Sequence, residues 1–368
     1  MRGIMRLPLF ALLMSLGTIA LEASVPFYTE PVPFNFHLDA GFREDNLKFR
    51  VGPRTTKFEE VRHLDSHRAH KTHSKVKWRN LKIAQIEGSF DYTTHNDYYI
   101  RANADYGRVL DGFGRVTNFF ARRHHHFDEG SDYGSFGDDS SYNDSGSGSG
   151  SSYSRERREY SEQTSRSENG YVADLVGGVG WKVVGLDGRS WIAGLGGYSY
   201  HRQSYEMTHF EQKFDLIDLV NVGKIPGLKG TYVTCWTGPW LGVDYLSKIE
   251  YDVTLYGSLE WHFAKFRADG RWTYTEAYNG HFRQNSQGYG AVARMGLDWT
   301  PCDNWAFGIC GDYQIWSTKN KGRNRATVVN NLPMGDEIDL TFPVVERASL
   351  RRVRWNSYSI NGLVTYRF

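Results

Sequence analysis

Few features of this sequence suit a disulfide-stabilised, nucleic-acid-binding or helical membrane protein. Cysteine occurs only at Cys235, Cys302 and Cys310, which is too few for a disulfide scaffold and leaves at least one thiol free or paired with another chain. The net charge of +2 provides no overall field to attract nucleic acid. After the N-terminus, no apolar run approaches the ~20 residues that a membrane-spanning helix needs.

Aromatic residues and glycine are abundant instead. The chain has 23 Tyr, 21 Phe, 11 Trp and 39 Gly residues but only 10 Pro, while the mean hydropathy is −0.55. A polar average combined with many aromatic side chains favours β-strands over helices. We therefore expect an all-β protein.

The N-terminal residues have the pattern of a secretory signal peptide. Arg2 and Arg6 flank the apolar run LPLFALLMSLGTIA, and the small residue Ala23 follows. A basic start, a short apolar stretch and a small residue at the end are typical of a cleaved export signal. A membrane anchor is the alternative, but the run is shorter than a spanning helix. We predict a signal peptide over residues 1–23 and one domain over residues 24–368.

Alternation between apolar and polar residues is the main structural pattern. In the closing segment WNSYSINGLVTYRF, Tyr358, Ile360 and Val364 fall on one side, and the other side is mostly polar. The same period of two, which is the signature of a strand, recurs in residues 98–106, 252–263, 289–299 and 305–316. The apolar sides carry Trp and Tyr near strand ends, as in the aromatic girdles of outer-membrane barrels.

The connections between these segments alternate in length. The predicted strands cover about 34–52, 75–92, 97–118, 168–184, 189–207, 231–247, 250–276, 287–300, 304–318 and 353–368. Tight links are expected near 93–96, 185–188, 248–249 and 301–303, and longer ones at 53–74, 119–167, 208–230, 277–286 and 319–352. Tight turns on one side and long loops on the other are typical of a membrane barrel.

We therefore predict a transmembrane, antiparallel, up-and-down β-barrel of about ten strands, with long extracellular loops, in the outer membrane of a Gram-negative envelope. The first and last strands must pair, because a membrane tolerates no unpaired strand edge. A soluble β-sandwich is the alternative, but it would explain neither the alternating loop lengths nor the outward aromatic residues.

Charged residues are expected inside the barrel. The polar sides predict an inward position for Asp252, Glu260, His262, Lys265, Arg267, Asp269, Arg271, Arg294, Asp298 and Asp312. Ten strands enclose a narrow interior, whereas open aqueous pores typically take ~16–18. These side chains should form either a hydrogen-bonded plug or a narrow water-filled path, and a wide porin is disfavoured.

Two loop segments have unusual compositions. A Gly/Ser-rich stretch followed by mixed charge, about residues 128–167, is predicted to be a disordered insertion. His63, His67, His70 and His73 have spacings that would place them on one helical face, where imidazole could bind Zn²⁺ or Cu²⁺. A solvated basic loop that binds nothing specific is the alternative, because the cluster contains no cysteine.

Several stretches resemble the omptin family of outer-membrane proteases, and in particular the chlamydial Protochlamydia outer membrane protein family. They include WIAGLGGYSYHRQSYE, TYVTCWTGPWLGV and YDVTLYGSLEW. The run from Pro239 to Gly242 is the most specific, since omptins have a similar Pro-aromatic-aliphatic-Gly run. The resemblance extends from about residue 34 to residue 368.

This resemblance implies a catalytic rim made of an Asp-x-Asp pair and an Asp-x-His pair that activate a water. Asp132 matches the second Asp of the first pair, but Gly130 stands where the first is expected. His281 matches the histidine, but Asn279 replaces its Asp. An Asn cannot stabilise an imidazolium by charge, so general-base activity should fall by orders of magnitude.

The expected function is therefore non-enzymatic, with a structural or adhesive role at the surface or a narrow porin-like role. The alternative is an active protease that uses Asp132 and His281 with a further carboxylate such as Asp128, Glu129 or Glu276. Expected partners are outer-membrane lipid and lipopolysaccharide, the barrel-assembly machinery at the C-terminal strand and a host-surface ligand. Neither a cofactor nor nucleic acid is expected.

Overall fold

The computed structural model describes residues 34–56, 70–120, 159–185, 188–215, 222–250, 252–275, 278–302, 304–319, 322–334 and 338–368. Within these ranges all regular structure is β-strand, and no helix there could cross a membrane. The strands are β1 (Phe34–Thr56), β2 (His70–Thr93), β3 (Tyr98–Phe120), β4 (Glu159–Val184), β5 (Ser190–Asp215), β6 (Gly223–Lys224), β7 (Lys229–Lys248), β8 (Val253–Thr275), β9 (Tyr278–Cys302), β10 (Trp305–Thr318), β11 (Gly322–Met334) and β12 (Ile338–Arg367).

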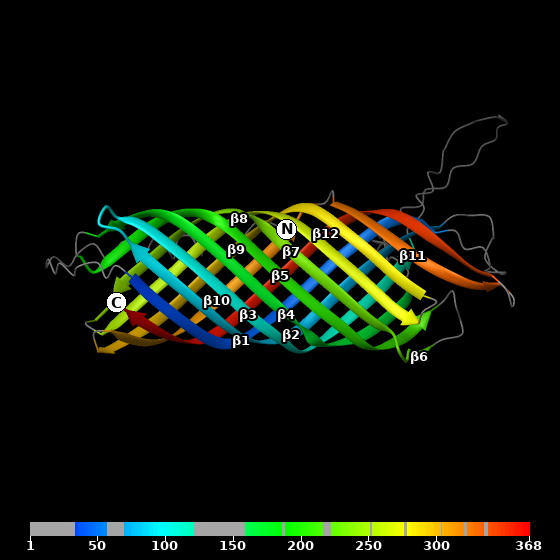
Figure 1. The fold of residues 1–368 in the computed structure, drawn as a ribbon, viewed down its shortest axis with the longest axis horizontal. Helices are drawn as coiled ribbons and strands as arrows, with labels where there is room; N and C mark the ends of the chain where they lie inside the picture. The colour runs from blue at the N-terminus through cyan, green and yellow to red at the C-terminus, as the bar shows by residue number, and fades with distance from the viewer. Residues whose placement is uncertain are drawn as a thin grey trace, which may run out of the picture.

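The strands form a closed antiparallel barrel (Figure 1). Closure comes from β1, which pairs with β2 on one side and with β12 on the other, from Asn35 opposite Arg367 to Val51 opposite Leu350. β10 and β11 occupy one place in the wall, because both lie between β9 and β12. Since β6 is a two-residue strand beside β5, the twelve strands fill ten positions. The predicted fold is confirmed.

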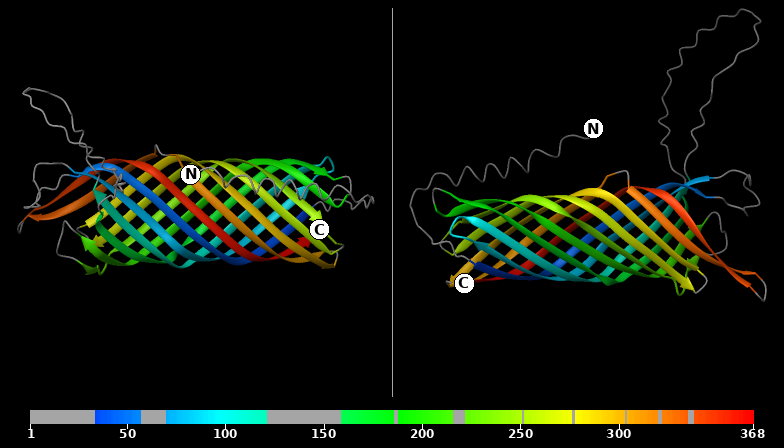
Figure 2. Two further views of the ribbon diagram at one scale, coloured as in Figure 1. Left: turned by 180° about the vertical axis from the view of Figure 1, so that it is seen from behind. Right: turned by 45° about the horizontal axis from the view of Figure 1, so that its top comes forward.

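The two ends of the barrel differ. The tight connections and the C-terminus lie at one end, which we call the turn end (Figure 1). At the opposite end, the loop end, the hairpin of β11 and β12 projects beyond the rim (Figure 2). Strands extend well into the segments predicted as loops, because the ladder hydrogen bonds continue past the apolar alternation that marks the lipid-facing part.

Several predicted boundaries are wrong for this reason, and three of them differ most. Residues 322–334 and 338–352 are strand where a loop over 319–352 was expected. β9 begins at Tyr278, so the predicted loop over 277–286 is instead mostly strand. β4 begins at Glu159 and pairs with β3, so residues 159–167 do not belong to a disordered insertion. Residues 1–33 and 121–158 lie outside the described residues.

The polarity of the inner and outer faces of the wall reverses along the barrel axis. In the half near the turn end, large apolar side chains face outward, including Phe42, Ile309 and Ile360, which are 69%, 64% and 72% exposed. In the half near the loop end, the apolar side chains face inward, as shown by Trp78 and Tyr232, which are 1% and 0% exposed. The first half therefore suits a lipid surrounding, and the second half suits water.

Because of this exchange, part of the predicted set of inward-facing residues is wrong. Glu260 and His262 face inward and are buried, as expected. Lys265, Arg267, Asp269 and Arg271 lie on the opposite, exposed face of β8. They occupy odd positions, whereas the inward residues of β8 are even, so these four charges belong to the water-facing outer wall of the loop-end half.

Candidate functional site in the barrel lumen

His281, the predicted catalytic histidine, lies on the outer wall. Its neighbour Phe282 points inward and is buried, so successive alternation directs His281 outward. Its Nε2 lies 3.3 Å from Asp269 Oδ1, which also accepts a hydrogen bond from Arg283 Nε at 3.0 Å. These partners form an exposed surface ion pair. In the described part of the chain, His281 therefore lies on the outer wall of β9 and does not face the lumen.

The other predicted site residues do not form a site in the described part of the chain. Gly130, Asp132, His63 and His67 lie outside the described residues, as do Asp128, Glu129 and Glu276. The backbone of Asn279 belongs to β9, opposite Thr273 and Val329. His70 and His73 belong to strand β2, so the helical spacing that predicted a metal site does not apply to them. Across the described ranges, no group of three His, Cys, Asp or Glu residues could hold a metal ion.

Stacked aromatic rings fill the lumen in the loop-end half. Phe49 from β1 and Trp78 from β2 lie 5.2 and 4.8 Å, centroid to centroid, from Tyr232 of β7. Phe282 of β9 and Tyr205 of β5 complete this aromatic plug. Since β1 and β7 stand on opposite sides of the ring of strands, the contacts cross the whole interior.

The plug is held in place by a hydrogen bond to a neighbouring side chain as well as by packing. Tyr232 donates through its hydroxyl to Gln284 Oε1 at 2.8 Å. Burial raises the pKa of this hydroxyl well above its usual range, so it stays a neutral donor. A second layer lies nearer the turn end, where Trp316 stacks on Trp355 at 5.6 Å and packs against His201 at 4.6 Å.

Between these rings and the turn end, three inward-facing arginines, of which Arg43 is buried and Arg101 and Arg294 are partly buried, hold the strands together. Arg43 of β1 donates through Nε to Asp45 Oδ1 and through Nη1 to Asp174 Oδ2, both at 2.8 Å. The same Nη1 lies 3.4 Å from Asp105 Oδ2. The carboxylate of Asp174 also lies 3.1 Å from His201 Nδ1. One guanidinium thus joins carboxylates from β1, β3 and β4.

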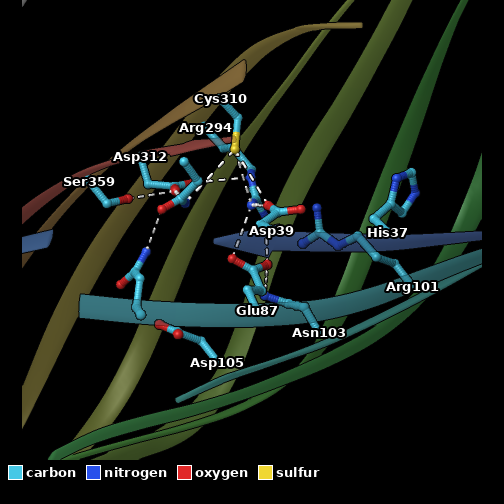
Figure 3. Close-up of polar contacts among 12 residues, drawn as sticks. His37, Asp39, Glu87, Arg101, Asn103, Asp105, Arg294, Cys310, Asp312 and Ser359 are labelled. Carbon is cyan, nitrogen blue, oxygen red and sulfur yellow. Dashed lines mark hydrogen bonds and ion pairs between the residues drawn. The ribbon is translucent and has the colours of Figure 1, made fainter. Parts of the chain in front are cut away.

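Arg294 of β9 is the centre of a second network (Figure 3). Its Nη1 donates to Glu87 Oε1 of β2 at 2.6 Å, and its Nη2 donates to Asp39 of β1. Its Nε lies 3.2 Å from Asp312 of β10, and Cys310 Sγ lies 3.5 Å from Nη2. Bidentate and multiple carboxylate contacts suit the planar fork of arginine, so this group fixes distant strands relative to each other.

The third network, around Arg101, includes a serine, a histidine and a glutamate that are linked one to the next by hydrogen bonds. Arg101 donates to Asp244 at 2.7 Å and also to Glu260. Glu260 Oε2 lies 2.9 Å from His262 Nε2, and His262 Nδ1 lies 2.9 Å from Ser199 Oγ. Ser199 and His262 are only 2% and 0% exposed. Neither residue lines the cavity that occupies the lumen nearer the turn end. A nucleophilic serine needs access to a substrate, so this chain of hydrogen bonds positions side chains and does not form a catalytic triad.

A cavity of about 920 Å³ occupies the lumen between the networks and the turn end. Its wall includes Arg43, Arg101 and Arg294, together with turn residues such as Asp97, Arg189 and Cys302. The three arginines face eight carboxylates in ion pairs, namely Asp39, Asp45, Glu87, Asp105, Asp174, Asp244, Glu260 and Asp312. The cavity is therefore polar and acidic, and the aromatic plug separates it from the loop end.

Inward charge on β8, β9 and β10 was predicted, but the acids of β1 to β4 were missed. Asp39, Glu87, Asp105 and Asp174 each alternate with outward apolar residues, for instance Leu38 beside Asp39. That alternation is the signal in the sequence that could have identified them. Their ion pairs with Arg294 or Arg43 could not be predicted in the same way, because these contacts depend on the strand register around the whole barrel.

The chain matches the family described as Protochlamydia outer membrane protein over residues 37–140 and 130–368. No curated protein matches it. Among solved structures, the outer membrane protease OmpT from Escherichia coli superimposes with a TM-score of 0.59 at 12% identity, covering 94% of this chain and 99% of that one. The translocator domain of the autotransporter NalP from Neisseria meningitidis aligns with a TM-score of 0.30 at 10% identity, covering 98% and 95%. The likeness to OmpT shows the fold alone, and the family match covers nearly all of the described residues: this chain is an outer-membrane β-barrel of the Protochlamydia outer membrane protein family.

Proposed function

We propose that this protein is a non-enzymatic barrel with a structural or adhesive role at the cell surface, on an omptin-like scaffold. The aromatic plug is the observation that carries the proposal. It fills the lumen at the loop end with packed rings, where an omptin-type cleft would need polar catalytic groups. Outer-leaflet lipid, including lipopolysaccharide, is the proposed partner of the exposed apolar band, and a host-surface ligand is the proposed partner at the loop end.

The alternative protease function has less support. It depends on His281 acting as a general base, and this imidazole lies on the outer wall beside Asp269 and Arg283. A general base must come within hydrogen-bond reach of the reacting water in the substrate site. No inward carboxylate of β8 or β9 near the loop end, among the described residues, stands in for it.

A narrow porin-like path is the second candidate, and the cavity of about 920 Å³ favours it. Its charged wall already provides a polar route through the lipid-facing half. The remaining barrier is the aromatic plug, which a conducting state would have to displace. Ion passage would then be slow and gated, since ten strands leave little space beyond side chains.

Two assays on the refolded full chain separate these functions. Current across a planar bilayer should show no steps for the wild type and clear steps for the double variant Trp78→Ala, Tyr232→Ala. Steps in the wild type would favour the porin-like path over the structural role. A fluorogenic peptide library should give no cleavage above the His281→Ala control, and cleavage that this substitution abolishes would restore the protease function.

A further inference from the structure

A row of carboxylates crosses the inner wall of the cavity from strand to strand. Asp39 of β1 stands opposite Glu87 of β2, which in turn stands opposite Asp105 of β3 (Figure 3). Asp105 stands opposite Asp174 of β4. Beyond Asp39, the same register continues across β12 and β10 to Asp298 of β9. We call these five residues the acidic row.

The acidic row runs lengthwise through the cavity. Asp298 lies four residues from the turn-end terminus of β9 at Cys302, whereas Asp174 lies ten residues from that of β4 at Val184. Strands of a barrel tilt by about 40°, so a row at constant register rises by about 3 Å at each strand. All five residues of the row line the cavity. They therefore offer negative charge along its length and not at a single point.

The arginines compensate the acidic row only in part. Arg43 is shared by three carboxylates and lies 3.4 Å from Asp105, farther than from either of the others. Arg294 is also shared by three carboxylates, among them Asp39 and Glu87. Among the described residues, eleven carboxylates but only seven arginines and lysines line the cavity. Like charges directly opposite each other on neighbouring strands destabilise a sheet, so a bound cation would stabilise the row.

Several acceptor oxygens in the cavity wall have no hydrogen-bond donor among the described residues. Asp39 and Asp298 are only 2% and 5% exposed, yet Oδ1 of each carboxylate lacks a partner. The same holds for Oδ1 of Asp105 and for the side-chain amide oxygens of Gln85 and Asn103. Buried polar atoms normally have a hydrogen-bond partner. These oxygens therefore point to a ligand that donates hydrogen bonds as well as carrying positive charge.

We propose that the acidic row binds a linear aliphatic polyamine that enters the cavity from the turn end. Each ammonium group of such a molecule is a cation with several N–H donors. Neighbouring strands are about 4.8 Å apart, so the carboxylates recur at a spacing comparable to that between the ammonium groups of a propylene-linked polyamine. A bare metal ion donates no hydrogen bond, and no group of three His, Cys, Asp or Glu in the described ranges could hold one.

The route of entry follows from the two ends of the cavity. The aromatic plug closes the lumen toward the loop end, whereas the turn residues Gly185, Asp252 and Pro301 line the cavity at the turn end. The proposal concerns this cavity alone. It therefore stands or falls separately from the structural or adhesive role at the cell surface.

The test is isothermal titration calorimetry of spermidine, a linear triamine, into the refolded full chain in uncharged detergent micelles. The double variant Asp105→Asn, Asp298→Asn removes two charges of the acidic row at nearly constant size. The control Asp269→Asn, Glu211→Gln removes two charges from β8 and β5 at positions that do not line the cavity. A heat-dependent gel shift confirms that each variant folds.

The wild type should bind spermidine saturably, and the double variant should bind it at least about tenfold more weakly, as expected for two lost charge-assisted hydrogen bonds. The control should change the affinity by less than about twofold. n-Butylamine, which has one ammonium group, should bind the wild type at least about tenfold more weakly than spermidine. Mg²⁺ at equal concentration should not displace spermidine, because it gives up its own water reluctantly.

No saturable binding to the wild type, equal losses in the two double variants, or displacement by Mg²⁺ would overturn the proposal. If the double variant does not refold, Asp298→Asn alone provides the test, since Oδ1 of this carboxylate has no partner to lose. That variant should bind spermidine at least about threefold more weakly. An unchanged affinity would contradict the proposed site.

Discussion

The turn-end half and the loop-end half of the barrel are built from the same strands with opposite distributions of side chains. On β1, Phe42 faces out and Arg43 faces in, whereas six residues later Lys48 faces out and Phe49 faces in. The outer apolar face requires lipid, and the inner apolar face requires a packed core. We therefore infer that the membrane boundary crosses the strands about halfway along their length.

This difference determines how the interior is stabilised. Near the turn end, guanidinium–carboxylate networks join distant strands, and each is sensitive to loss of one member. Near the loop end, packed aromatic rings join distant strands without any charged groups. A substitution should therefore have an effect that depends on the half and the face where it is made.

The largest effect should come from breaking a buried charge network. Arg43→Met would leave Asp45, Asp105 and Asp174 without their shared cation and should lower the free energy of unfolding by about 3–5 kcal/mol. Urea unfolding in detergent, followed by tryptophan fluorescence, measures this loss. Arg283→Met on the outer wall is the control and should cost less than about 0.5 kcal/mol. Equal costs would mean that the Arg43 network contributes no more than a surface ion pair.

Truncating the plug should be nearly as costly. Trp78→Ala removes a fully buried ring that contacts Tyr232 and should destabilise the barrel by about 3–5 kcal/mol, because the surrounding rings collapse only partly. The same unfolding assay applies. Trp299→Ala, which removes an outward ring that is 55% exposed, should cost less, and the reverse order would contradict the assignment of the core.

A charge on the lipid-facing wall should have a smaller but clear effect. Ile309→Arg should impair assembly in lipid vesicles by about 2–4 kcal/mol, because the position lies in the apolar band. Gln287→Arg, on the outer wall above the band, should be tolerated. Folding yield from a heat-dependent gel shift reports both, and equal tolerance would show that lipid does not contact Ile309.

The smallest effect should come from the hydrogen bond between Tyr232 of the plug and Gln284. Tyr232→Phe keeps the ring but removes the donor to Gln284, and should cost about 0.5–1.5 kcal/mol. Restoring stability in the double variant Tyr232→Phe, Gln284→Leu would show that the loss comes from an unsatisfied buried amide. A loss of stability equal to that of Trp78→Ala would instead show that the hydroxyl contributes as much to the stability of the plug as a whole buried ring.

The fold was predictable because period-two alternation and loop lengths are local properties of the sequence. The inward positions of Glu260, His262, Arg294 and Asp312 followed from the same alternation. The convergence of Asp39 and Glu87 on Arg294 could not be predicted, since it depends on the register accumulated around the ring. The outward position of His281 could not be predicted for a similar reason, because a shift of a strand by one residue moves every side chain to the other face.

The position of the membrane boundary can be measured directly by a spin-label scan along the outer face of β8. In a variant without cysteine, nitroxides at positions 259, 261, 263, 265, 267 and 269 would report collisions with oxygen and with a water-soluble nickel complex in nanodiscs. Oxygen contact should dominate through Phe263, and nickel contact should dominate from Lys265 onward. Oxygen contact that continues to position 269 would contradict the halfway boundary and, with it, the exchange of faces between the two halves.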